Sequence, residues 1–104
     1  KWRVVGGSGS GSLTVATTTG DVTIAATTDV QLVNLTSAIA TITLPAVASG
    51  KLIRIKDIAG TATTFNITIL RGGSSLIDDQ TSLVMTQNYQ SINLVCDGTN
   101  WYAV

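Results

Sequence analysis

The chain has 104 residues, a formal net charge of zero at pH 7 and only 12% charged residues, about half the usual share. A domain of this length buries about two thirds of the surface that its unfolded chain exposes. The neutral charge argues against electrostatic binding to nucleic acid or an anionic membrane, and the apolar runs are too short for a membrane-spanning helix.

The residue types favour β-structure. All six acidic residues are aspartates, and the sequence contains no histidine. Thr, Val and Ile, which favour strands, are plentiful, whereas helix-favouring Glu, Lys, Arg and Met are scarce or missing. We therefore expect one all-β domain over residues 13–104.

Two segments precede this domain. Residues 1–5 (KWRVV) resemble a strand, and their Trp-Arg-Val-Val pattern is similar to Trp-Tyr-Ala-Val at residues 101–104. They are interpreted either as an N-terminal strand or as the end strand of a preceding module of the same type in a tandem array. The Gly/Ser-rich segment 6–12 is a flexible linker, either native or introduced by engineering.

From residue 13 onward, short β-like runs recur between turn residues. Pro45 cannot donate to a strand ladder and ends the run before it. In the run 51–57, Ile53 and Ile55 point to one face, while Arg54 and Lys56 point to the other. The expected strands cover residues 13–16, 21–25, 30–35, 38–44, 51–57, 64–70, 75–77, 81–86, 91–96 and 101–104. About nine or ten strands at this spacing predict an antiparallel, jelly-roll-like β-sandwich.

The last fourteen residues predict a closing β-hairpin. Ile92, Leu94 and Cys96 share one face of an extended strand, and Asp-Gly-Thr-Asn at 97–100 supplies turn residues. The single cysteine cannot form an internal disulfide. Because Cys96 lies on the inward face, it is expected to be a small core residue rather than a nucleophile.

Several strands are apolar on both faces, notably residues 30–35 and 82–85. Mean hydropathy is positive, at +0.38, so a lone domain of this size would leave much apolar surface in water. Strands of this kind are expected where a second surface covers them. The sequence therefore predicts self-association, with a monomer coated by threonine methyl groups as the alternative.

A series of short motifs resembles the β-rich modules of bacteriophage tail fibres and related virion appendages. The motifs, in chain order, are TITLP (41–45), GKLIRIKD (50–57), NITI (66–69), LIDDQT (76–81), NYQSINL (88–94) and DGTNW (97–101). The resemblance covers roughly residues 20–104. It implies a non-enzymatic homotrimeric segment or tip of a fibre, made in the host cytoplasm and located in the virion. It also implies attachment to a host surface glycan or protein receptor.

The sequence carries no recognisable catalytic, cofactor or metal motif. Without histidine, neither a histidine-based triad nor a histidine-containing metal site can form. Asp78 and Asp79 form the only adjacent pair of carboxylates. They are expected to be solvated turn residues, with Ca²⁺ binding as the alternative.

Binding is the remaining chemistry. Asn88, Tyr89 and Trp101 are the candidate ligand contacts, because aromatic rings offer apolar area together with a polar group. Tyr89 lies in a polar stretch that favours exposure, whereas Trp101 at a hairpin is typical of a core or subunit interface. The alternatives to a fibre module are a carbohydrate-binding module of a secreted enzyme and a cell-surface adhesin or S-layer repeat.

Overall fold

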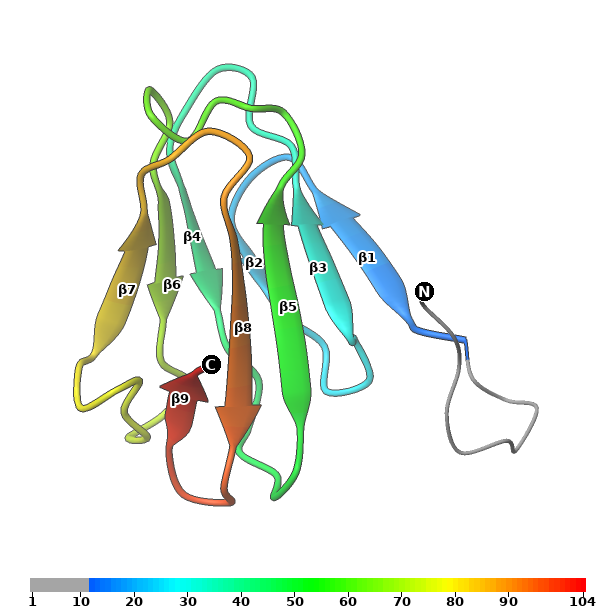
Figure 1. The fold of residues 1–104 in the computed structure, drawn as a ribbon, viewed down its shortest axis with the longest axis vertical. Helices are drawn as coiled ribbons and strands as arrows, with labels where there is room; N and C mark the ends of the chain where they lie inside the picture. The colour runs from blue at the N-terminus through cyan, green and yellow to red at the C-terminus, as the bar shows by residue number, and fades with distance from the viewer. Residues whose placement is uncertain (1–11) are drawn as a thin grey trace.

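The computed structural model describes residues 12–104, which form nine β-strands (Figure 1). The strands are β1 (Val15–Thr18), β2 (Val22–Thr23), β3 (Val30–Val33), β4 (Ala40–Thr43), β5 (Leu52–Asp57), β6 (Ile67–Leu70), β7 (Ser82–Met85), β8 (Ser91–Cys96) and β9 (Trp101–Ala103). The expected all-β class and strand number are confirmed for this part of the chain. The predicted strand at 1–5 and nearly all of the predicted linker at 6–12 lie outside the described residues. Within 12–104, no helix could cross a membrane.

The first six strands alternate between two sheets. One sheet has the order β1-β3-β5-β8-β9, and the other has the order β2-β4-β6-β7. Each turn of the chain therefore adds one strand to each sheet. The added strand pairs in parallel with the strand that the previous turn placed in the same sheet. We call this arrangement the two-sheet coil.

The expectation of an antiparallel, jelly-roll-like sandwich is wrong in strand direction, because four of the seven strand pairs are parallel. The short connection after β1 resembles a hairpin turn, and the Thr18 hydroxyl donates to the carbonyl of Gly20 at 2.8 Å within it. This turn leads to the other sheet rather than back along β1. The chain passes through β2 in the other sheet and then comes back to form β3 beside β1. This passage is the crossover connection that two parallel strands require.

The last three strands run antiparallel and complete the sheets. β7 pairs with β6, β8 pairs with β5, and β9 pairs with β8. The predicted closing hairpin is therefore confirmed. Its turn is held by Asp97, whose Oδ1 accepts the N–H groups of Thr99 and Asn100, both at 2.9 Å, while Gly98 adopts a φ of 99°.

A single hydrophobic core draws residues from both sheets. Residues from one face of each of β2 to β9 enter it or pack against it, as a pleated strand allows, whereas β1 contributes none. The fully buried side chains with the largest volumes are Trp101, Ile24, Leu35, Ile42, Leu44, Ile53, Ile55, Ile67, Ile69, Ile77, Met85 and Leu94. Cys96 is also buried and free, so the prediction that it is a core residue is confirmed.

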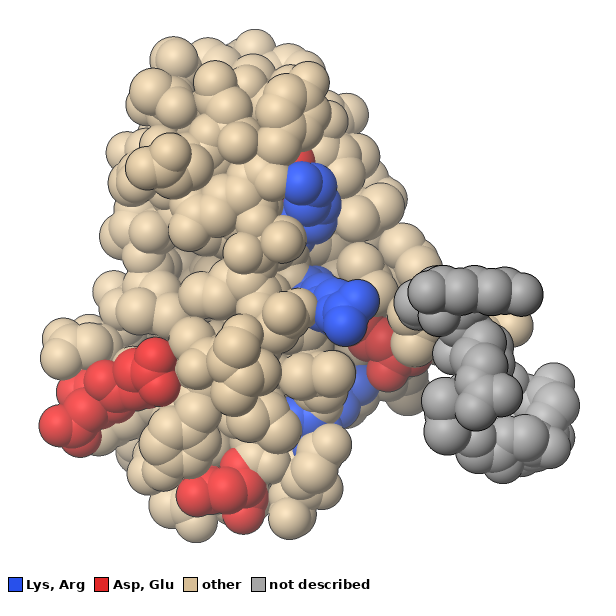
Figure 2. All heavy atoms as spheres, viewed as in Figure 1, with Lys and Arg blue, Asp and Glu red and all other residues tan. Residues whose placement is uncertain are grey.

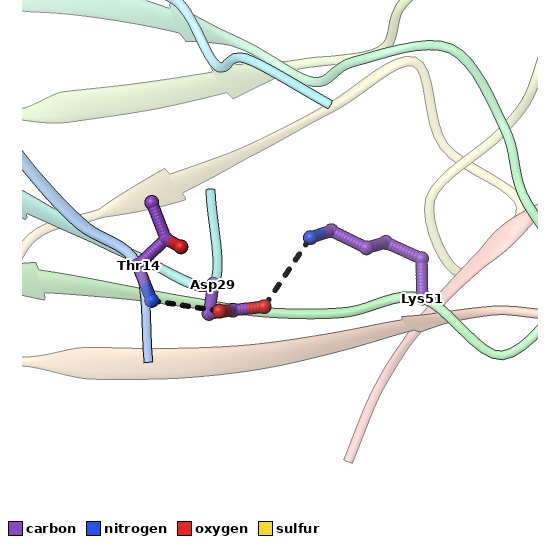
Figure 3. A network of polar contacts seen from close by, with 3 residues as sticks. All are labelled: Thr14, Asp29 and Lys51. Carbon is purple, nitrogen blue, oxygen red and sulfur yellow. Dashed lines mark hydrogen bonds and ion pairs between the residues drawn. The ribbon is translucent and has the colours of Figure 1, made fainter. Parts of the chain in front are cut away.

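Aspartates join successive turns of the two-sheet coil through backbone hydrogen bonds. Asp29 accepts the N–H of Thr14 at 2.8 Å and forms an ion pair with Lys51 at 3.5 Å (Figure 3). In the other sheet, Asp21 accepts the N–H of Thr41 at 2.8 Å. The Thr14 N–H is the main reason that the pKa of Asp29 is lowered; burial opposes this effect and Lys51 adds to it. These carboxylates therefore stabilise the coil as acceptors.

Candidate binding site

The carboxylate of Asp57 organises the loops at one end of the molecule. Asp57 ends β5 on the same face as Ile53 and Ile55, so its side chain points inward and is fully buried. Its Oδ1 accepts the N–H groups of Ala59 and Gly60, both at 3.1 Å. Its Oδ2 accepts those of Ala62 and Tyr89, both at 3.0 Å. One side chain thus holds the loop after β5 against the loop before β8.

These hydrogen bonds determine the charge of Asp57. Burial by itself raises its pKa, but the N–H groups of Tyr89, Ala62, Gly60 and Thr61 outweigh burial and leave the pKa below its ordinary value. The carboxylate is therefore ionised at neutral pH and has no proton to donate. Its lone pairs are used by the backbone, so Asp57 is a positioning residue for the loops.

Tyr89 is held in place but remains exposed. Its backbone has a φ of 62°, its N–H is bound by Asp57, and its carbonyl accepts a hydrogen bond from the Lys56 ammonium. The ring lies against Gly60, where an added Cβ would come within 2.4 Å of a ring carbon. The side chain is nevertheless 60% exposed, and the Lys56 ammonium lies 5.7 Å from the ring centroid. Tyr89 therefore presents an aromatic surface beside a cation.

Asn88 serves the fold as well as the surface. The residue is exposed, but its side-chain oxygen accepts the N–H of Thr63 at 2.9 Å. Within residues 12–104 its amide nitrogen donates no hydrogen bond, so that group is the part of Asn88 that is available to a ligand.

Trp101 is not a binding residue in this structure, and the prediction that it contacts a ligand is wrong. Its side chain is fully buried in the core, and its indole Nε1 has no hydrogen-bond partner in the described chain. Trp101 begins β9, whereas Tyr89 precedes β8, so the two aromatic residues lie at opposite ends of β8 (Figure 1). The expected core alternative is the correct one, because a tryptophan at this position closes the end of the core.

Asp78 and Asp79 form a tight turn, as expected. Both have a positive φ, of 47° and 69°, and the turn is flanked by hydrogen bonds between Ile77 and Gln80. Asp78 Oδ1 also accepts the N–H of Ala103 at 3.2 Å. Across residues 12–104, no cluster of three or more Asp, Glu, His or Cys side chains is placed to hold a metal ion.

The outer face of the five-stranded sheet brings together residues that the sequence did not connect. Arg54 and Lys56 of β5 lie directly opposite Asn93 and Ser91 of β8. We call these four residues, together with Tyr89, the basic strip. Figure 2 shows basic side chains following one another along this face. The alternation of residues 51–57 predicted that Arg54 and Lys56 share an outward face. Only the strand pairing shows that Asn93 and Ser91 are their neighbours.

The chain matches no known protein-family model and no curated protein sequence. The likeness to phage fibre modules therefore rests on the motifs quoted above.

Proposed function

We propose that the chain is a non-enzymatic structural and host-attachment module of a phage tail fibre or virion appendage, and that it acts as a homotrimer. The observation that carries the proposal is the amount of apolar surface left outside the core. Large hydrophobic side chains that are exposed in the single chain are Leu13, Val15, Ile39, Val47, Leu52, Ile58, Leu70, Val84, Tyr89, Tyr102 and Val104. Such surface is stabilised when other copies cover it.

The charge distribution indicates which face the copies share. The outer side of the four-stranded sheet carries Thr23, Thr41, Thr43, Thr68, Leu70, Ser82 and Val84. We call this surface the threonine face. Its seven residues are uncharged, and the exposed Asp21 carboxylate lies beside them and accepts the N–H of Thr41. The five-stranded sheet instead carries Arg54 and Lys56 near its centre. Copies packed on that side would bury cations with no carboxylate opposite them, which is costly. The threonine face includes the exposed Leu70 and Val84 and carries no cation, so copies can pack on it without burying an unpaired lysine or arginine. In this arrangement Val15, Leu52 and Tyr102 of the five-stranded sheet stay in solvent.

Light scattering combined with charge substitutions tests this proposal. The unchanged chain should have a mass close to three protomers. Thr68 and Val84 are neighbours in register on the threonine face, so the double variant Thr68→Lys/Val84→Lys should be monomeric. Thr17→Lys is the matched control, because Thr17 is exposed on β1 of the other sheet, and it should keep the mass of the unchanged chain. A monomeric unchanged chain would contradict the proposal.

A carbohydrate-binding module that works as a monomer is the second candidate. It is favoured by the exposed ring of Tyr89, whose backbone N–H is held by Asp57, because such a ring suits the apolar face of a sugar. A specific hit on a glycan array, given by a chain that light scattering shows to be monomeric, would support this function over a fibre module.

A further inference from the structure

We propose that the basic strip binds an acidic glycan, that is, a polysaccharide whose sugars carry carboxylate, sulfate or phosphate groups. This inference rests on the host-attachment role proposed above and names the ligand class and its site. The site is the row formed by β5 and the start of β8 on the outer face of the five-stranded sheet.

The cations of the strip face solvent without a carboxylate partner in the described part of the chain. Arg54 and Lys56 are two residues apart on β5, so their Cα atoms are about 7 Å apart and their side chains share one face. The one ion pair among residues 12–104 joins Lys51 and Asp29. Asp57, the nearest carboxylate in sequence, is buried and committed to backbone N–H groups. An anionic ligand would therefore meet two cations without displacing an ion pair.

The neighbours of these cations suit a sugar. Asn93 lies opposite Arg54 and offers both a donor and an acceptor, while Ser91 lies opposite Lys56 and offers a hydroxyl group. Cross-strand partners of this kind are about 5 Å apart at their Cβ atoms, so a cation and its polar neighbour can contact the same ligand. The Tyr89 ring, held beside Lys56, adds an apolar surface at the end of the row.

The small number of cations on the chain favours a glycan over a nucleic acid as the ligand of the basic strip. Nucleic-acid binding depends on many phosphate contacts, each made by a cation. Residues 12–104 contain only four Lys and Arg side chains, and the whole chain is neutral. Two cations that form no ion pair in the described part of the chain, flanked by hydroxyl, amide and aromatic groups, fit a polymer that carries widely spaced charges and many hydroxyl groups. The Lys56 ammonium also donates to the carbonyl of Tyr89.

Binding should be measured on the unchanged chain with polygalacturonate, dextran sulfate and neutral dextran as probes. We expect binding to at least one acidic polymer and none to dextran, with affinity falling several-fold when salt rises from about 0.05 M to about 0.5 M. Which acidic polymer binds distinguishes a carboxylate from a sulfate ligand. Equal binding to dextran, or binding to no probe, would overturn the inference.

Arg54→Gln is the decisive variant, and Arg71→Gln is its matched control. Arg71 lies in the turn after β6, away from the strip, and its guanidinium bonds the carbonyl of Ser74. Removing Arg54 should weaken binding about tenfold, the equivalent of losing one charged contact, whereas removing Arg71 should change it less than twofold. An equal loss of affinity in the two variants would show that the polymer is attracted by overall charge, and it would overturn the site. Because binding and mass are measured separately, a monomer that binds through Arg54 would refute the fibre module but not this site.

Discussion

At the scale of single residues, aspartate is the side chain that organises this fold. Asp21, Asp29, Asp57, Asp78 and Asp97 all accept backbone N–H groups at strand ends or in turns. Asp57 does this from full burial, where a carboxylate is tolerated only because several N–H groups surround it. These five aspartates, which would otherwise be candidates for catalysis or metal binding, therefore serve mainly as acceptors that hold the backbone.

Asp57→Asn should lower the free energy of unfolding by about 2–4 kcal/mol, since the amide removes a charged acceptor and turns an NH₂ group toward backbone donors. The pKa of Asp57 is lower in the folded chain than its unfolded value of 3.8. Its stabilising contribution is therefore complete above that value and is lost as pH falls through the folded pKa. Urea unfolding from pH 7 down to about pH 2.5 should show a smaller loss of stability in the variant. An identical pH dependence in both proteins would contradict this role.

At the scale of elements, β5 is the centre of the molecule. It pairs with β3 on one side and with β8 on the other, and it joins the parallel coil to the antiparallel ending. Its inward residues are core, its outward residues include the cations of the basic strip, and its last residue is Asp57. β1, by contrast, has one partner among the described strands and lies at the edge of its sheet.

Hydrogen exchange should reflect this difference. The amides of β5 are expected to be among the slowest to exchange, because they lie between two paired strands over a fully buried row. The amides of β1 should exchange faster by about tenfold or more, since β1 is paired on one side and largely exposed. Site-resolved exchange by NMR would measure both strands together. Equal protection of β1 and β5 would mean that another surface covers β1.

At the scale of the whole molecule, the two outer faces differ in charge and are proposed to differ in role. The threonine face would pack against other copies, and the five-stranded face would remain exposed with its basic strip. Such a division lets several strips act together. Linked sites bind a polymer more tightly than single sites do, because the first contact raises the effective concentration for the next.

The Thr68→Lys/Val84→Lys variant, once shown to be monomeric, tests this division. It keeps every residue of the basic strip, so its affinity for a short acidic oligosaccharide in solution should equal that of the unchanged chain. On a surface densely coated with acidic polysaccharide, it should dissociate about a hundredfold faster, because avidity is lost. Surface plasmon resonance at two coating densities would compare the proteins. Equal dissociation on the dense surface would show that the strips act singly.

The candidate site was predictable only in part from the sequence. Tyr89 was correctly expected to be exposed, because polar neighbours surround it, but its contacts with Lys56 and Gly60 join distant loops and could not be foreseen. Trp101 offered the same aromatic signal and is buried, because the packing of β9 on the core determines its position. A single aromatic residue near a turn does not distinguish these two outcomes.

The sequence by itself determined the all-β class, the inward rows such as Ile53 and Ile55, the end of the fourth strand before Pro45 and the closing hairpin. These features depend on local rules, namely side-chain alternation, a missing N–H donor and turn-forming residues. Only the tertiary structure decided strand direction and sheet membership. Alternation has the same period in parallel and antiparallel strands, and a turn such as 19–21 does not reveal to which sheet the chain proceeds. For the same reason, the pairing of Arg54 with Asn93 is a property of the fold.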